Sequence, residues 1–320
     1  MKHLKVLFFV GLVSVWQTSN CQSLILPDPI FTQTMTSPMY FNPAYAGMQE
    51  NLRASFQIRA QLLAGTANLT TDASIDIGLP KINSGIGLML MSDQGDNASL
   101  VTNTISAFYA YEMKLNQSAH LRLGIDASLF QRLYIYENST FDTSASSSQQ
   151  FTPQNYATLA IPNFGAGGLY YDNKYYFGLS VFNLFTPNVS FDNDPNGLLS
   201  RRFVLQAGEF VNYGNLVINP YIQVINQGSV DQILPGCNVS GGNFTFGLSF
   251  RQSIPVFDAL NFLLGFGKGK IKICYSYDLA LSSSNPGALS GTHELSAVVQ
   301  LSGPHDVNDK KMIGFFRGAY

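Results

Sequence analysis

Two adjacent residues near the C-terminus, His293 and Glu294, are the first candidates for catalysis. A zinc protease places two histidines four residues apart on one helix face, with the intervening glutamate as general base. Position 297 is Ala297, so the second histidine is missing. The pair also lies in a segment of alternating apolar and polar residues, which is typical of a strand. Zinc-protease chemistry is therefore not predicted.

A second candidate is the glycine-rich run at 265–270, which also contains Lys268 and Lys270. Glycine-rich loops cradle phosphate when the next element is a helix whose N-terminal N–H groups point at the anion. Here the run is followed from Ile271 by another alternating segment. We interpret it as a hairpin turn between two strands.

Hydrolysis by a serine nucleophile would need Ser, His and an acid or amide group facing one another. Within the alternating segments the only histidines are His120 and His293, and neither is near a recognisable nucleophile motif. A hydrolase built on the outer wall or rim stays open as an alternative. We predict that the protein is not an enzyme, with no catalytic residues, no metal ligands and no cofactor.

The composition indicates which elements position these residues. Charged residues make up 12% of the chain and aromatic residues 13%, whereas about a quarter of a soluble domain is charged. Beyond the N-terminus there is no apolar run of about 18 residues, so a membrane would have to be crossed by strands. The net charge of -2 and the absence of a large basic cluster argue against nucleic acid as a partner.

The first 21 residues are typical of an export signal. Lys2 and Lys5 form a positive region before an apolar stretch that is too short to span a membrane. We expect cleavage before Gln22, which makes 1–21 a signal peptide. The alternative is that Cys21 is lipidated as the first residue of a lipoprotein.

Period-two alternation is the main structural signal. In 121–129, leucine, isoleucine and alanine alternate with Arg122, Gly124, Asp126 and Ser128, so the two sets fall on opposite faces of a strand. The alternating segments run for about 10 to 14 residues, longer than the usual five or six of soluble strands. Tilted membrane strands need about nine to eleven.

About fourteen such segments follow one another between residues 51 and 302, and the pattern of their links indicates a barrel. Every second link is tight, whereas several of the others, including 92–98, 137–158, 186–199 and 282–290, are long and polar. We predict an all-β fold, a transmembrane antiparallel up-and-down β-barrel. The tight links are Pro80–Lys81, Asn116–Gln117, Asp172–Asn173, Gly214–Asn215, Gly241–Gly242 and Lys268.

The remaining parts of the chain complete the domain prediction. The segment 22–50 has no long alternation and is expected to be a periplasmic segment that folds into or under the barrel mouth, with a disordered leader as the alternative. Residues 51–302 form the barrel and 303–320 a periplasmic tail. Both termini are thus expected in the periplasm, and the barrel in the outer membrane.

Several sequence blocks together resemble the PorP/SprF family of type IX secretion system membrane proteins, over residues 28 to 302. The two most specific parts are the opening Asn42–Gly47, which reads Asn-Pro-Ala-Tyr-Ala-Gly, and a pair near the C-terminus. In order, the blocks are Phe31–Met35, Asn42–Gly47, Asp93–Gly95, Tyr109–Tyr111, Asn163–Gly167, Tyr175–Ser180, Tyr275–Asp278 and Gly291–Leu295.

This resemblance implies a non-enzymatic outer-membrane component that docks or supports the secretion and surface display of a large partner protein, such as a gliding adhesin. Its implied partners are outer-membrane lipid, type IX machinery subunits and that secreted protein. A passive or substrate-specific channel is the alternative. The family-motif residues that become candidates for partner contact are Asn42, Pro43, Tyr45, Gly47, Tyr275, Asp278, His293 and Glu294.

Overall fold

The alternating segments form antiparallel strands of one sheet in the computed structural model. It describes residues 28–49, 51–63, 66–95, 99–135, 156–192, 194–253, 256–281 and 291–301. The expected signal peptide, 1–21, and the expected tail, 303–320, lie outside these ranges. No helix in the described part of the chain combines the length and the hydropathy that a membrane-crossing helix needs.

The helical elements are short and belong to the N-terminal part, apart from one turn. They are α1 (Pro38–Phe41), η1 (Pro43–Tyr45) and η2 (Pro80–Ile82). The strands are β1 (Leu52–Leu63), β2 (Thr66–Leu79), β3 (Ser84–Gly95), β4 (Leu100–Lys114), β5 (His120–Ile135), β6 (Tyr156–Tyr171), β7 (Tyr175–Phe182), β8 (Arg202–Glu209), β9 (Val211–Tyr213), β10 (Leu216–Gln227), β11 (Val230–Gly241), β12 (Phe244–Ser253), β13 (Val256–Lys268), β14 (Ile271–Ala280) and β15 (Gly291–Leu301).

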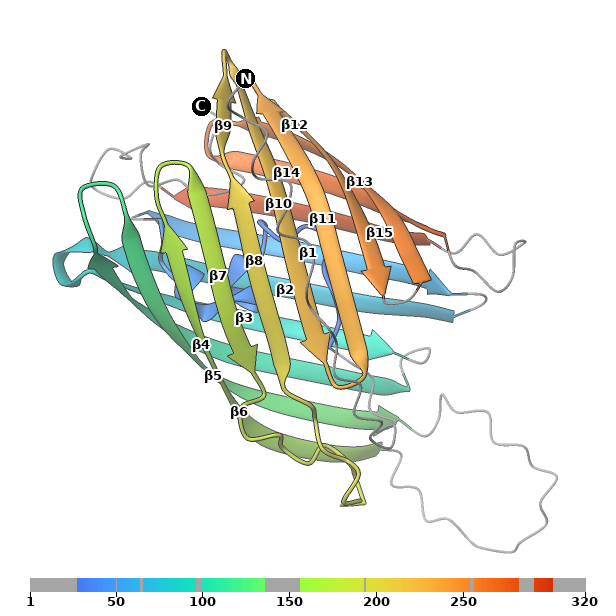
Figure 1. Ribbon diagram of the computed structural model, residues 1–320. Coiled ribbons are helices and arrows are strands. Elements are labelled where there is room, and N and C mark those ends of the chain that lie inside the picture. Colours follow the sequence, from blue (N-terminus) through green and yellow to red (C-terminus); the bar gives the residue numbers. More distant parts are fainter. Residues whose placement is uncertain are drawn as a thin grey trace, which may run out of the picture.

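The sheet closes on itself, as Figure 1 shows. Each strand pairs with its neighbours in the chain, and β1 pairs with β15 over eleven residue pairs from Leu52↔Leu301 to Leu62↔Gly291. Both β8 and β9 pair with β10, so they occupy one position in the wall, interrupted at Phe210. The fifteen strands therefore fill fourteen positions, and the prediction of a closed antiparallel barrel is confirmed. Closure leaves no unpaired sheet edge.

The two rims of the barrel differ in the length of their connections. At one rim, named here the short-turn rim, the links are 80–83, 115–119, 172–174, 214–215, 242–243 and 269–270. Gly214, Gly242 and Gly269 in these turns have positive φ, which glycine adopts without strain. The opposite, long-loop rim carries the links 136–155, 183–201 and 282–290, together with shorter ones.

The two faces of the wall differ in polarity. Apolar side chains point outward, for example Ile125, which is 60% exposed. The charged residues at inward positions are buried: Arg53, Arg59, Asp72, Asp76, Glu112, Arg122, Asp126, Arg202, Arg251, Lys272, Asp278 and Glu294. Glu209 lies at the short-turn end of β8, opposite Tyr175. Outward apolar and inward polar is the pattern of membrane barrels, and opposite to that of a soluble sandwich.

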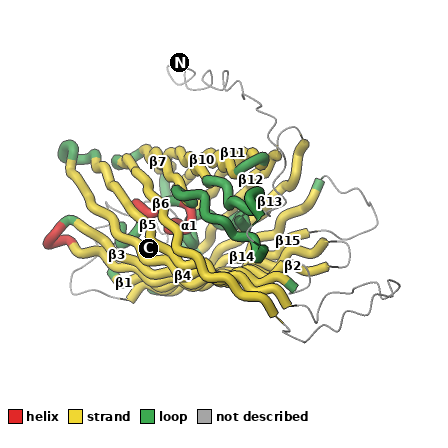
Figure 2. Tube along the Cα trace, turned by 90° about the horizontal axis from the view of Figure 1, so that it is seen from below, coloured by secondary structure: helices red, strands yellow, loops and turns green. Residues whose placement is uncertain are grey.

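The inward polar residues do not face an open channel. Residues 28–49, named here the lumen segment, lie inside the barrel and contain α1 and η1; in the view from below, α1 lies enclosed between the strands (Figure 2). Almost all side chains from Phe31 to Gly47 are buried. Phe31, Met39 and Phe41 form an apolar cluster with Phe108 and Leu169 of the wall, which explains why Phe108 breaks the polar pattern of the inner face.

If the outward face contacts hydrocarbon, a charge there should be costly in proportion to its depth. We expect Ile125→Arg, on the outer wall of β5, to reduce the free energy of unfolding by about 2–4 kcal/mol. The matched change Ile82→Arg, in the short turn η2, should cost about 0–1 kcal/mol. Denaturant titration of the protein refolded into lipid vesicles measures both. Equal, small costs at the two positions would contradict a lipid-facing outer wall.

Candidate functional site

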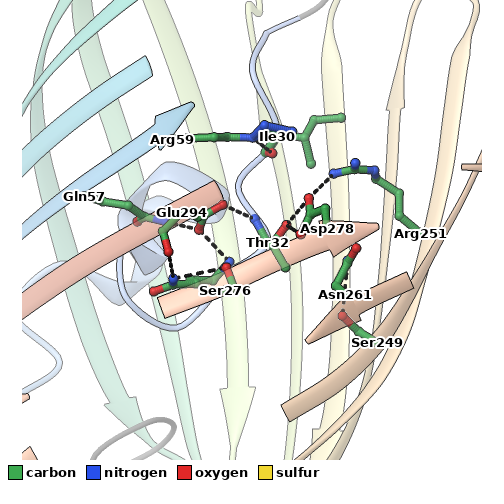
Figure 3. Close-up of polar contacts among 11 residues, drawn as sticks. Ile30, Thr32, Gln57, Arg59, Ser249, Arg251, Asn261, Ser276, Asp278 and Glu294 are labelled. Carbon is green, nitrogen blue, oxygen red and sulfur yellow. Dashed lines mark hydrogen bonds and ion pairs between the residues drawn. The ribbon is translucent and has the colours of Figure 1, made fainter. Parts of the chain in front are cut away.

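The lumen segment is held most firmly by a buried carboxylate of β15. The two oxygens of Glu294 accept hydrogen bonds from the backbone N–H groups of Thr32, at 2.9 Å, and Gln33, at 2.9 Å. Figure 3 shows the carboxylate directed at the segment. Because two adjacent backbone N–H groups bond to the two oxygens of one side chain, this pair fixes the backbone of the segment to the wall.

A second carboxylate, Asp278 of β14, holds the same residue from the adjacent strand. The hydroxyl of Thr32 lies 2.9 and 2.8 Å from the two oxygens of Asp278. Arg251 of β12 donates to Asp278 at 3.2 Å, which supplies an opposite charge inside the barrel. Buried charges are tolerated when they are both paired and hydrogen-bonded, and here the segment supplies part of that requirement.

Side chains of β1 and β14 complete this contact, named here the carboxylate dock: Gln57, Arg59, Ser276, Asp278 and Glu294. Arg59 donates through Nε to the carbonyl oxygen of Ile30 at 2.8 Å. Gln57 donates to Glu294. The side-chain amide of Gln33 donates to Ser276 at 3.1 Å. Residues of three strands, β14, β15 and β1, therefore form hydrogen bonds with residues 30–33.

The second half of the segment is held by Asn42. Its Oδ1 accepts from the N–H of Ala44 at 2.9 Å and thereby caps η1. Its Nδ2 donates to the carbonyl oxygen of Gly168 in β6 at 2.9 Å. Nearby, the hydroxyl of Ser180 in β7 donates to the carbonyl oxygen of Phe41 at 2.5 Å. One asparagine thus starts η1 and attaches it to the wall.

Glycines in β5 and β6 let this half approach the wall closely. A Cβ at Gly124 would lie 2.3 Å from the backbone nitrogen of Ala44, and one at Gly167 would lie 2.2 Å from Oδ1 of Asn42. Both distances are shorter than a nonbonded contact allows, so the backbone of the segment occupies the space of the missing side chains.

The end of the segment is fixed by two arginines near the short-turn rim. Arg122 donates to the carbonyl oxygens of Ala44, at 2.8 Å, and Ala46, at 2.6 Å, and pairs with Glu112 at 2.8 Å. Gly47 has φ of 59°, and its N–H donates to Asp76, which pairs with Arg53. The carbonyl groups that η1 leaves unpaired are therefore satisfied by the wall.

Tyr40 of the segment packs against an arginine of the wall. The guanidinium of Arg202 lies 4.2 Å from the ring centroid of Tyr40 and 4.5 Å from that of Phe182 in β7, a cation–π arrangement. The hydroxyl of Tyr40 donates to the carbonyl oxygen of Pro29. This arginine therefore holds the middle of the segment to the wall.

The eight residues singled out from the sequence divide between the two faces of the wall. Two, Tyr275 and His293, point outward near the long-loop rim, where the hydroxyl of Tyr275 lies 2.8 Å from Nδ1 of His293. The other six are buried in the lumen: Asn42, Pro43, Tyr45 and Gly47 in the segment, and Asp278 and Glu294 in the wall. Contact of any of the eight with a partner protein stays a prediction.

The site residues that sequence reasoning missed are mostly those that bond to a residue already singled out. Thr32 and Gln33 lie in a recognised block, but their partnership with Glu294 spans more than 260 residues. Inward position in an alternating strand was the available signal for Arg122 and Gly124. In the described ranges no cluster of three or more His, Cys, Asp or Glu side chains is arranged to bind a metal ion. The geometry is suited to holding the segment.

Removing the Glu294 carboxylate should release the first half of the segment. In Glu294→Ala the N–H groups of Thr32 and Gln33 lose their acceptor, at a cost of about 1–3 kcal/mol each. We expect chymotrypsin to cleave after Phe31 and Tyr40 in this variant, detected by mass spectrometry of the folded protein. The control His293→Ala changes the neighbouring, outward residue and should be as resistant as wild type. Equal resistance of Glu294→Ala would show that the carboxylate does not hold the segment.

A methyl group at Gly124, where the lumen segment lies against β5, should destabilise the protein, whereas the same change on the neighbouring strand should not. Gly124→Ala meets backbone, so we expect a loss of about 1–3 kcal/mol in the free energy of unfolding. Gly168→Ala is the matched control, because its Cβ would make only an ordinary contact, 3.7 Å from Leu123. Urea unfolding compares the two, and an equal effect would mean that the segment does not lie against β5.

Comparison with solved structures finds outer-membrane barrels and channels at very low sequence identity. A FadL homologue from Pseudomonas aeruginosa is 10% identical, with 82% of this chain and 94% of that chain covered and a TM-score of 0.46. The TodX deltaS2S3 mutant monoaromatic hydrocarbon channel is 9% identical, over 82% and 92%, with a TM-score of 0.48. The CymD monoaromatic hydrocarbon channel is 10% identical, over 85% and 94%, also with a TM-score of 0.48.

A search of curated proteins gives no match. A family model, however, matches almost the whole barrel and the lumen segment together, over residues 25–299. That range contains every sequence block on which the resemblance rested, including both sides of the carboxylate dock. Its description is type IX secretion system membrane protein PorP/SprF. The chain therefore belongs to the PorP/SprF family of type IX secretion system membrane proteins.

Proposed function

We propose that this protein is a non-enzymatic scaffold of the type IX secretion system in the outer membrane. In this role it supports the secretion and surface display of a large partner protein, such as a gliding adhesin. The family supplies the secretion system, and the barrel fold supports the outer-membrane location. The observation that carries the scaffold role is the lumen segment, in which almost all side chains of residues 31–47 are buried and the backbone is bonded to the wall.

Two cavities between the lumen segment and the wall are small, which favours a scaffold over an open channel. One lies between Asp28, Phe130 and Arg132 and measures about 60 Å³. Another, beside Tyr40 and Asp126, measures about 30 Å³. Since one water molecule needs about 10–15 Å³ of such space, these cavities hold a few waters each.

The orientation that fits this role places the short-turn rim in the periplasm and the long-loop rim outside the cell, as in other outer-membrane barrels. Leu301, the last described residue, pairs with Leu52 at the short-turn rim. The machinery subunits would then meet the short turns, and the secreted partner would meet the long-loop rim.

At the long-loop rim, the link between β7 and β8 packs against the barrel wall. In the link between β7 and β8, Val189 and Leu199 are buried against Phe130 and form a small cluster. Arg132 donates to the carbonyl oxygen of Val189 at 2.6 Å. This link therefore lies across the mouth of the barrel, and we propose it as the contact for the secreted partner.

Deletion of the gene should abolish surface display of one large cargo, and the wild-type copy should restore it. A copy in which residues 190–197 are replaced by a glycine–serine linker of equal length tests the mouth contact specifically. We expect it to form a heat-modifiable barrel but not to restore display, measured by antibody labelling of intact cells. Unchanged display of every type IX cargo after deletion would defeat the proposal.

The second candidate function is a passive or substrate-specific channel, a role that the barrel fold also permits. Planar-bilayer recording separates the two functions. We expect wild type to show no steady conductance, and Glu294→Ala to show frequent openings because the segment is loosened. Steady conductance through wild-type protein with residues 28–49 in place would favour the channel.

A further inference from the structure

The two ends of the lumen segment lie at opposite rims of the barrel. At its C-terminal end, Gly47 bonds to Asp76, three residues before β2 ends at Leu79 and the short turn begins. At its N-terminal end, the N–H of Asp28 donates to Gln227 at 3.0 Å. Gln227 is the last residue of β10 before its link at the long-loop rim. Arg202, which begins β8 at the same rim, lies 3.5 Å from the Asp28 carboxylate.

Contacts between these ends follow the same order. Ile30 meets Arg59, and Thr32 meets Glu294, the fourth residue of β15 counted from the long-loop rim. Farther along, the carbonyl oxygen of Thr36 meets Arg53, the second residue of β1 counted from the short-turn rim. Ala44 then meets Arg122, close to the start of β5. The segment therefore begins at the long-loop rim and ends near the short-turn rim, and between these ends Tyr40 lies close to Arg202, which donates to its carbonyl oxygen at 2.9 Å.

We infer that the lumen segment begins on the long-loop side and ends on the short-turn side, so that Asp28 and Leu301 face opposite sides of the membrane. The expectation that both termini lie on one side concerns residues outside the described ranges and stays a prediction. The inference deepens the proposed function, on which it rests only for the statement that the long-loop side is the cell exterior. On that orientation, Asp28 lies beside the mouth contact for a secreted partner.

The test is the accessibility of short epitope tags on whole cells. One tag is inserted immediately before Asp28, a second between Gly228 and Ser229 at the long-loop rim, and a third between Gly214 and Asn215 at the short-turn rim. Antibody binding is compared on intact cells and after permeabilisation of the outer membrane. We expect the tags at Asp28 and Gly228 to be labelled on intact cells, and the tag at Gly214 only after permeabilisation.

The three tags separate failure of the inference from failure of the proposed orientation. If the Asp28 tag is labelled together with the Gly214 tag, or on neither side although present in denatured protein, the inference is overturned. If the Asp28 and Gly228 tags are both labelled only after permeabilisation, the two positions lie at the same rim as inferred, but that rim faces the periplasm and the proposed orientation is wrong. Should a tag prevent folding, Asp28→Cys in a Cys237→Ser background can be labelled with a membrane-impermeant maleimide. Labelling on intact cells or only after permeabilisation then distinguishes the same outcomes.

Discussion

The buried carboxylates of Glu294 and Asp278 set the constraint that shapes the rest of the structure. A carboxylate buried inside a barrel is stable only when donors surround it, and the wall supplies only part of the donors to these two. Thr32 and Gln33 of the lumen segment contribute two backbone N–H groups and a hydroxyl. The wall and the segment are therefore each incomplete without the other, and a filled lumen follows from the residues that line it.

The same contacts connect the two ends of the barrel wall. Glu294 and Asp278 belong to the last two strands, whereas Arg59 and Arg53 belong to the first, and all four bond to the segment that directly precedes β1. The segment thus bridges the junction of β15 and β1, where the sheet closes. A scaffold held in this way gains rigidity at its seam, which suits a component that other proteins must bind in a fixed geometry.

Much of the wall could be predicted from sequence, because strand periodicity and turn chemistry are local. The alternation in 121–129 placed Arg122 and Asp126 inside, where they are buried, and Leu123 and Ile125 outside. The glycine turns at 214 and 242 marked strand ends because they adopt positive φ. Periodicity shows which face a residue occupies but not what fills the other side. The pairing of Thr32 with Glu294, the close approach at Gly124 and the direction of the segment are long-range features that no local pattern encodes.

Amide hydrogen exchange of residues 28–49 in the lipid-embedded, full-length protein tests the central claim most directly. The N–H groups of Thr32 and Gln33 point at a buried carboxylate, so they should exchange as slowly as the amides of β1 and β15, and accelerate when Glu294 is replaced by Ala. Exchange of Thr32 and Gln33 in wild type as fast as in an unfolded peptide would mean that the segment does not fill the lumen, and would contradict the account.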